Sequence, residues 1–196
     1  MSDRLIIFGA GGHGRVVADC ARLMERWADI FVFDDGLGAG YSFDDLLSAD
    51  AGTCSAFVAI GRNAVREGLQ TRLQDRGFTL PIIRHPSAIV AGDAAIGAGT
   101  LLAAGSIVNP GAVVGQGCII NTAASIDHDC RLADFVHVAP GARLAGTVVV
   151  GARSWIGLAA AVIENLSLGA DVTVAAGAVV IDNVEDRRTM MGVPAK

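Results

Sequence analysis

Aliphatic residues recur at every sixth position through the second half of the chain. Stepping by six from Val90 meets valine, isoleucine or leucine at each of sixteen positions up to Val180, without an insertion. Four residues after each of these aliphatics, the side chain is mostly small or β-branched. Two inward side chains in every six residues predict short strands joined by tight corners, because a helix would spread this pattern around its circumference. The period therefore predicts a parallel β-helix.

Three such hexapeptides make one triangular coil, so the repeat predicts about five coils, stacked about 4.8 Å apart. We expect glycines at the corners, where the backbone needs a positive φ. Cys118 and Cys130 fall on the small inward position and are predicted to be buried, reduced thiols of the core. The charged segment 182–191 breaks the repeat and predicts a cap over its open end.

A different pattern precedes the repeat. Residues 4–8 predict a buried strand, a helix follows to about Trp27, and residues 30–33 predict a second strand. Residues 9–14, Gly-Ala-Gly-Gly-His-Gly, stand between the first strand and the helix, and Asp34-Asp35 ends the second strand. This is the spacing of the dinucleotide fingerprint, in which glycines let a diphosphate approach a helix N-terminus and the acidic residue accepts ribose hydroxyls.

One further strand–helix–strand stretch follows, with strands expected at 56–60 and 80–83 and a helix at about 63–77. These elements make up about half of a dinucleotide-binding fold, so a nucleotide-sugar fits the available space better than NAD. We therefore predict a small Rossmann-like α/β domain at residues 1–84, followed by a β-helix domain at residues 85–196.

Composition and charge narrow the class of protein. Hydrophobic residues make up 52% of the chain and aromatic residues only 5%, as a narrow interior of aliphatics requires. No charge occurs from Ala94 to Ile126, but the six glycines and Pro110 in that stretch argue against a membrane helix. Residues 1–4 lack the basic start of a signal peptide, and a net charge of −5 argues against nucleic acid. We expect a cytoplasmic protein without a membrane span.

The repeat register places His128 at an outer corner, between Asp127 and Asp129. A neutral imidazole beside a carboxylate is suited to accept a proton near neutral pH. Gly146 stands one coil later in the same column, where it is expected to leave room for a narrow ligand.

The other three histidines have separate positions. His137 precedes an inward valine and is predicted to point outward, on the same face as Trp155 one coil later. His13 lies in the glycine loop, where it would contact a ligand phosphate or pack locally. His85 precedes a proline at the domain boundary, which predicts a role in the linker.

These features together resemble the nucleotide-sugar acetyltransferases over nearly the whole chain. More narrowly, they resemble the branch of UDP-4-amino-sugar (bacillosamine-pathway) N-acetyltransferases and sialic acid O-acetyltransferases. The resemblance is carried by residues 9–14, Asp34-Asp35, 59–63, Asn121-Thr122, His128-Asp129, His137, 140–146 and 192–196.

The resemblance implies a left-handed β-helix and a homotrimer, with active sites between subunits and acetyl-CoA bound between neighbouring β-helices. It implies acetyl transfer to the amino group of a nucleotide-linked 4-amino-sugar, or alternatively O-acetylation of sialic acid or a related sugar. It implies no metal and no covalently bound cofactor. The implied roles are general base for His128 with Asp129 as its acidic neighbour; nucleotide-sugar contacts for Gly11, Gly12, His13, Asp34, Asp35, Gly61 and Asn121; and acetyl-CoA contacts for His137, Gly146 and Leu158.

Three other classes are weighed against this hypothesis. A zinc β-helix hydratase needs three imidazoles per metal, and the repeat holds only two histidines. A nicotinamide oxidoreductase leaves the repeat unexplained. The remaining alternative to an enzyme is a non-catalytic scaffold that binds a nucleotide-sugar.

Overall fold

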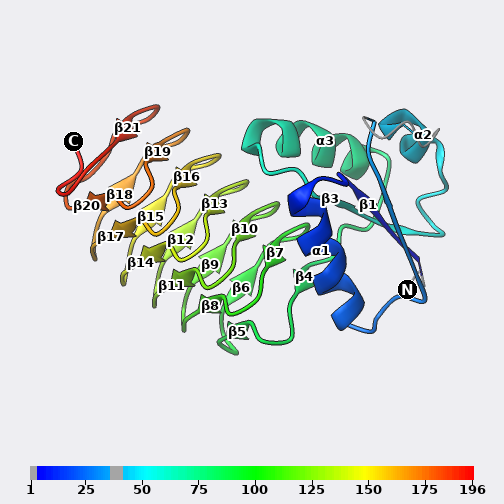
Figure 1. The fold of residues 1–196 in the computed structure, drawn as a ribbon, viewed down its shortest axis with the longest axis horizontal. Coiled ribbons are helices and arrows are strands. Elements are labelled where there is room, and N and C mark those ends of the chain that lie inside the picture. Colours follow the sequence, from blue (N-terminus) through cyan, green and yellow to red (C-terminus); the bar gives the residue numbers. More distant parts are fainter. Residues whose placement is uncertain (1–3, 36–41) are drawn as a thin grey trace.

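The structure, a computed structural model, describes residues 4–35 and 42–196. Residues 1–3, which entered the expectation about a signal peptide, lie outside the described part. The chain forms a small α/β unit that lies against the first coils of a long parallel β-helix (Figure 1). Both predicted parts of the fold are confirmed.

The α/β unit is a three-stranded parallel sheet in the order β2-β1-β3. Its strands are β1 (Arg4–Phe8), β2 (Asp29–Phe33) and β3 (Ser55–Val58), and its helices are α1 (Gly12–Leu23), α2 (Phe43–Ser48) and α3 (Asn63–Asp75). Helix α2, which the sequence pattern did not predict, begins with a capping box between Ser42 and Asp45. Two apolar clusters, one on each face of the sheet, form the core of this unit.

The strand expected at residues 80–83 does not join this sheet. Thr79, just before it, forms an isolated bridge with Ser55 of the sheet, and β4 (Ile83–Arg84) instead pairs with the β-helix. The reason is a backbone hydrogen bond from Ile83 N to Thr100 O, one coil ahead. Ile83 therefore belongs to the β-helix, although the apolar run at 80–83 predicted a strand of the α/β sheet.

The β-helix has three flat faces of two-residue strands. Face 1 consists of β4 (Ile83–Arg84), β7 (Leu101–Leu102), β10 (Ile119–Ile120), β13 (His137–Val138), β16 (Trp155–Ile156), β19 (Thr173–Val174) and β21 (Thr189–Met190). Face 2 consists of β5 (Ile89–Val90), β8 (Ile107–Val108), β11 (Ser125–Ile126), β14 (Arg143–Leu144), β17 (Ala161–Val162) and β20 (Val179–Val180). Face 3 consists of β6 (Ala95–Ile96), β9 (Val113–Val114), β12 (Arg131–Leu132), β15 (Val149–Val150) and β18 (Ser167–Leu168).

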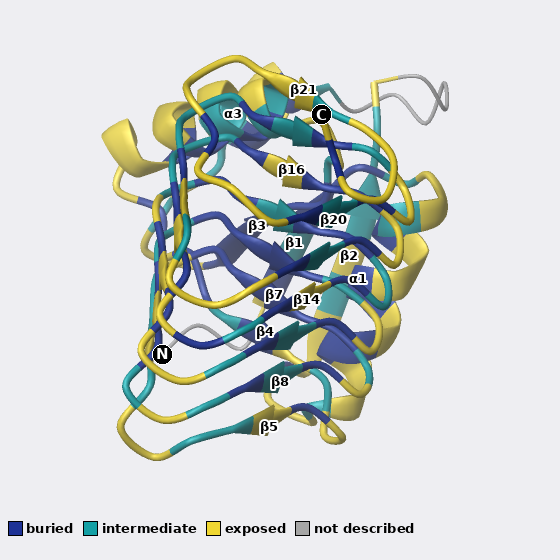
Figure 2. Cartoon of the chain, turned by 90° about the vertical axis from the view of Figure 1, so that its left-hand side faces the viewer, coloured by how far each residue is buried: buried dark blue, intermediate teal, exposed yellow. Residues whose placement is uncertain are grey.

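The faces of seven, six and five strands make the β-helix about one coil longer than expected. Residues 182–191 continue it as a last coil that contains β21, and Ala195 then folds back to donate a hydrogen bond to Val179 O. The aliphatics of the repeat fill the interior together with Cys118 and Cys130, both completely buried, as predicted. Figure 2 shows the buried strands within a rim of exposed corners.

The expectation that glycines turn the corners holds for only part of the β-helix. Many corner residues with positive φ are not glycine; they are Ala123, Asp129, Phe135, Thr147, Arg153, Ala159, Asn165, Asp171 and Arg187. A left-handed residue other than glycine costs about 1–2 kcal/mol, and the hydrogen bonds to the coils above and below offset this cost. These corners can therefore carry side chains, and one of them carries Asp129.

Face 1 holds the α/β unit. Its outward residues Ile83, Leu101 and Ile119 are buried in one cluster with residues of β1 and α1. The next outward residue in this column is His137, and Trp155 follows it at 38% exposure. The apolar contact between face 1 and the α/β unit therefore ends at the coil of His137, where polar and aromatic side chains replace the aliphatic ones. Among the described residues, no helix has the length and hydropathy needed to cross a bilayer.

Candidate active site

His128 and Asp129 form a hydrogen-bonded pair at the corner that joins face 2 to face 3. The Nδ1 atom of His128 lies 2.9 Å from Oδ2 of Asp129, and both side chains are exposed to solvent. The hydrogen bond to Asp129 raises the pKa of His128 above its usual value, and the charge of Asp127 acts in the same direction. With Nδ1 held by the carboxylate, Nε2 of a neutral imidazole is free to accept a proton.

The corner is held from the preceding coil. One oxygen of Asp127 accepts hydrogen bonds from the His128 backbone N–H at 2.7 Å and from the Asn109 side-chain amide at 2.9 Å. The bond from Asn109 is the main reason why the pKa of Asp127 lies below its usual value. Gly111 provides space for Asp129, because a Cβ at Gly111 would lie 2.5 Å from its Oδ1.

Gly146 provides space on the following coil. A Cβ at this position would lie 2.5 Å from Nε2 of His128, so the imidazole ring itself occupies the room that the missing side chain leaves. The sequence pattern predicted that Gly146 would leave room for a ligand. In the structure this space is occupied by the His128 ring, which lies over the glycine.

A second group of polar residues lies where the α/β unit meets face 1. The rings of His13 and His137 are 6.4 Å apart, and Nε2 of His137 lies 3.1 Å from the side-chain nitrogen of Asn121. Burial lowers the pKa of His13 to about 4 and that of His137 to about 3, and the nearby Arg66 acts in the same direction. Both imidazoles are therefore neutral near pH 7. We name His13, Asn121 and His137 the junction cluster.

His13 has spare hydrogen-bonding capacity in this cluster. Its Nε2 is buried and has no partner among the residues described. A buried imidazole nitrogen without a partner is costly, so it is suited to bind a polar group of a ligand. His137 was predicted to point outward, and it does leave the β-helix wall, but the α/β unit covers it.

The glycine loop adopts the geometry that the fingerprint requires. Gly9 has a φ of +112°, and a Cβ at Gly14 would collide with the Gly9 carbonyl. Gly11 and Gly12 are exposed at the start of α1, and the N-cap residue, Gly11, has no side chain to cap the first N–H groups of this helix. Such an N-terminus attracts anions.

The two acidic residues that follow β2 have different partners. Asp34 accepts a hydrogen bond from the backbone N–H of Ala10 at 3.1 Å, which places its carboxylate beside the glycine loop. Asp35 accepts one from the N–H of Phe43 at 2.8 Å, at the start of α2. The predicted pair is thus divided between the loop and the next helix.

The remaining predicted contacts lie on face 1 or next to it. Gly61 is exposed in the loop before α3, and its backbone hydrogen-bonds His137. Gly61 and Trp155 also line an open cleft of about 390 Å³ with Asn63 and Arg153. Leu158, at the corner between faces 1 and 2, is 54% exposed.

The sequence pattern gave no sign of Arg66, which lies at the centre of the domain contact. It is 1% exposed, and its five N–H groups donate to oxygens of Gly117, Ile60, Gly61, Asn63 and Phe135. An arginine on a polar helix is usually exposed, so only the structure identifies this one. Burial lowers its pKa to about 10, and it remains a cation.

The two histidine sites lie on different sides of the β-helix. The His128 corner joins faces 2 and 3, whereas the junction cluster lies on face 1. In a triangular prism, the corner between two faces is opposite the third face. Residues brought together by the expected reaction are therefore separated within one chain.

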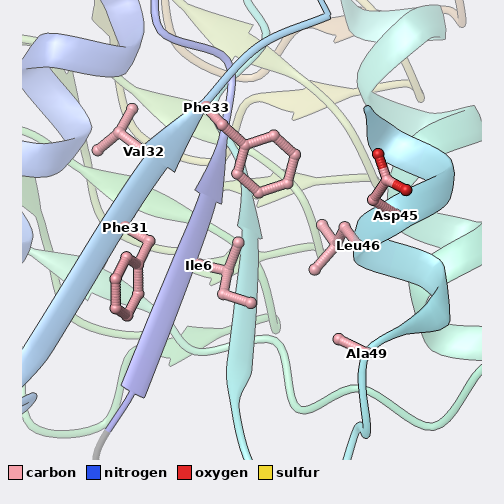
Figure 3. Close-up of a pocket in the computed structure, with 7 residues that line it drawn as sticks. All are labelled: Ile6, Phe31, Val32, Phe33, Asp45, Leu46 and Ala49. Atoms are coloured by element: carbon pink, nitrogen blue, oxygen red, sulfur yellow. The ribbon is translucent and has the colours of Figure 1, made fainter. Parts of the chain in front are cut away.

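A large apolar cavity lies apart from both sites. It has a volume of about 420 Å³ and lies between the sheet and α2 (Figure 3). Its lining is Ile6, Phe31, Val32, Phe33, Asp45, Leu46 and Ala49. None of these is a predicted site residue. Within residues 4–35 and 42–196, no three histidine, cysteine or carboxylate side chains are grouped to hold a metal ion.

Comparison with known proteins shows which family the chain belongs to. Residues 4–73 match the family described as the PglD N-terminal domain. GDP-perosamine N-acetyltransferase of Escherichia coli O157:H7 is 27% identical over 175 residues, which are 82% of this chain and 78% of the relative.

Two solved structures match over almost the full length. The acetyltransferase domain of PglB from Neisseria gonorrhoeae FA1090, in complex with acetyl coenzyme A, is 37% identical, with a TM-score of 0.95 over 100% of this chain and 99% of that one. PerB from Caulobacter crescentus, in complex with CoA and GDP-perosamine, is 37% identical, with a TM-score of 0.92 over 98% and 95% of the two chains. The chain therefore belongs to the nucleotide-sugar acetyltransferases of the left-handed β-helix superfamily.

Proposed function

We propose that this enzyme transfers the acetyl group of acetyl-CoA to the amino group of a nucleotide-linked 4-amino-sugar, with His128 as the general base. The exposed His128–Asp129 pair is the observation that carries this proposal. It is supported by relatives whose structures hold acetyl coenzyme A, or CoA together with GDP-perosamine.

The chemistry requires a base. The neutral amine attacks the thioester carbonyl carbon, and the nitrogen becomes positively charged as the new C–N bond forms. Nε2 of His128 accepts a proton from that nitrogen, and the C–S bond then breaks to release CoA. A positioned base of this kind contributes about 10²–10⁴-fold to the rate. Asp129 stabilises the imidazolium that forms, a role supported by its hydrogen bond to His128, which raises the pKa of the imidazole.

The α/β unit supplies the site for the nucleotide-sugar in this proposal. The diphosphate lies at the start of α1, where Gly11 and Gly12 expose free N–H groups, and Asp34 and Asp35 lie at the end of β2. The sugar then extends towards Gly61 and the junction cluster. The free Nε2 of His13 and the amide of Asn121 are placed to bind its polar substituents.

The coenzyme approaches the other side of the pair. Because Gly146 has no side chain, the β-helix wall does not obstruct the His128 ring, and a thioester can reach the imidazole. The exposed Leu158 offers apolar surface to the pantetheine arm. His137 was expected among the coenzyme contacts. Its place between His13 and Asn121 favours a position where the two substrates meet.

The separation of the two histidine sites favours active sites shared between chains. A sugar held by the α/β unit on face 1 cannot also lie at the opposite corner of the same β-helix, where His128 stands. A neighbouring subunit of a homotrimer would bring its own His128 to that sugar. We therefore propose a trimer with each site formed by the α/β unit of one subunit and the His128 corner of the next.

A complementation experiment tests this arrangement. His128→Ala and His13→Ala subunits are prepared separately, and each is expected to be weakly active on its own. Mixed trimers assembled from equal amounts should recover about a quarter of the wild-type activity, because one site in four then has both residues intact. No recovery in trimers shown to be mixed would place the whole site within one chain.

The acceptor is tested by following CoA thiol release from acetyl-CoA. The panel contains UDP-, GDP- and dTDP-linked 4-amino-sugars, their 4-hydroxy counterparts and free sialic acid. Rapid release with one amino-sugar and none with its hydroxy counterpart is expected. Preference for sialic acid would establish O-acetylation instead, and binding of nucleotide-sugars without any thiol release would indicate a non-catalytic scaffold.

A further inference from the structure

Helix α3 crosses successive coils of the β-helix with one polar residue per turn. The Asn63 amide donates to Arg153 O at 2.7 Å, Arg66 donates to Phe135 O at 2.9 Å and Gly117 O at 2.6 Å, and Gln70 donates to Ala98 O at 3.4 Å. These acceptors lie at or beside the corner between faces 3 and 1, each one coil from the next. The pitch of a helix, about 5.4 Å, nearly equals the spacing of about 4.8 Å between coils.

The contact is closely fitted as well as polar. Gln70 is completely buried, and its side chain occupies the space where a Cβ of Gly99 would lie. The ring of Phe135 takes the corresponding space at Gly117. The glycines of this corner therefore serve the docking of α3 in addition to turning the chain.

Apolar packing alone does not fix the level at which the α/β unit sits. The outward residues that it covers are Ile83, Leu101 and Ile119, three similar side chains at the same place on successive coils. A shift by one coil towards the C-terminus would keep aliphatic residues at two of the three positions and would bring His137 to the third. Groups with directional requirements distinguish one coil from the next more sharply than these similar aliphatic side chains do.

Arg66 has those requirements. All five of its N–H groups are satisfied by neutral oxygens, two on the β-helix and three in the segment 60–63. A shift by one coil would leave a buried guanidinium without several of these partners, at a cost of about 1–3 kcal/mol for each donor left unpaired. The same residue thus joins the loop of Gly61 to the coils of Gly117 and Phe135.

We propose that Arg66 is a positioning residue, which fixes the register of the α/β unit on the β-helix and thereby places the Gly61 loop against His137. Arg66 itself lies beneath the loop and does not bind substrate. The proposal rests on the function proposed above, in that the Gly61 loop contacts the nucleotide-sugar.

Arg66→Met tests this role, and Gln70→Leu is its matched control. Both substitutions remove a buried polar side chain of α3 that contacts the β-helix, but Gln70 does not reach the Gly61 loop. Both should lower the melting temperature. Arg66→Met alone should raise KM for the nucleotide-sugar by about 10-fold or more, since displacement by about 1 Å can cost up to 10²-fold. KM for acetyl-CoA should change by less than about twofold in both variants.

Arg66→Lys keeps a cation but cannot span both coils and the loop, so its KM for the nucleotide-sugar should lie between those of wild type and Arg66→Met. Arg66→Lys also tests the role of Arg66 if Arg66→Met does not fold. Equal changes of KM in Arg66→Met and Gln70→Leu, or none in either, would overturn the proposal.

Hydrogen–deuterium exchange gives a readout without substrate. Amides 60–63 should exchange faster in Arg66→Met or Arg66→Lys than in wild type, and should stay unchanged in Gln70→Leu. Unaltered exchange in the Arg66 variants would also overturn the role of Arg66. A wild-type enzyme that releases no thiol with any amino-sugar would contradict the proposed function. The exchange measurement would still test the role of Arg66, because it needs no substrate.

Discussion

The imidazole of His128 lies over the Cα of Gly146, the residue that follows it by one full coil. Parallel stacking of the coils brings them together, since Thr147 N donates to His128 O at 2.9 Å. The ring is thus held between Asp129, which bonds its Nδ1, and a wall from which a side chain is missing. The position of the proposed base depends on a glycine far away in the sequence.

Gly146→Ala should therefore impair catalysis without unfolding the protein. The new methyl group would lie 2.5 Å from Nε2 of His128 and displace the ring. We expect kcat to fall by about 10-fold to 100-fold, because misplacement of a catalytic group by about 1 Å has effects of this size.

The control for this substitution is Gly92→Ala. Gly92 also lies in the β-helix, and a Cβ there would have no atom within 4 Å. It should leave kcat unchanged, and both variants should melt close to wild type. Full activity of Gly146→Ala would show that the ring does not need the space seen here.

Asp129→Asn should shift the pH profile of the reaction. Asp129 raises the pKa of His128, and a general base works only when unprotonated, so the rate rises as pH increases through that pKa. Without the carboxylate the pKa falls, and the acidic limb of the kcat/KM profile should move to lower pH. The maximal rate should drop by about 10-fold or more, since the imidazolium loses its stabilising charge.

Asp127→Asn is the control variant for the pH profile of Asp129→Asn. Asp127 bonds the backbone of His128 and not its ring, so its substitution should move the limb less. A limb that stays in place in Asp129→Asn, or moves to higher pH, would contradict the assigned pair.

Acidification should destabilise the fold through the junction cluster. Burial holds the folded-state pKa of His13 at about 4 and that of His137 at about 3, against an ordinary value of 6.5. Below about pH 6.5 the unfolded chain therefore binds protons that the folded chain does not, and stability falls as pH decreases. At about pH 5.5 the loss is about 1 kcal/mol per histidine.

Melting curves between about pH 7.5 and pH 5.5 measure this effect. The double variant His13→Asn/His137→Asn should lose less stability over this range than wild type. An equal slope for the two proteins would mean that these imidazoles become protonated in the folded state.

The β-helix could be predicted from sequence because its signal is local and repeated. Each coil needs the same inward aliphatic, so the pattern of Val90, Ile96 and their successors determines both architecture and register. That register also placed His128 at a corner and His137 on a wall. The glycine fingerprint predicted the first α/β elements in the same way.

What the sequence could not show depends on contacts between distant segments. Nothing in the pattern distinguishes the buried Arg66 from exposed arginines of α3, because its burial results from docking against Gly117 and Phe135. For the same reason the α/β unit was not expected to cover His137. The strand at Ile83 was assigned to the wrong sheet because a short apolar run has no preference of its own between two parallel partners.

The most direct test of the central claim is the turnover of His128→Ala with acetyl-CoA and the preferred nucleotide-sugar. His128 is exposed, so the variant should fold, assemble and bind both substrates as wild type does. We predict that kcat falls by about 10²–10⁴-fold, while KM for each substrate and the melting temperature change little. Near-full turnover would contradict the account, because another group would then have to accept the proton of the amine.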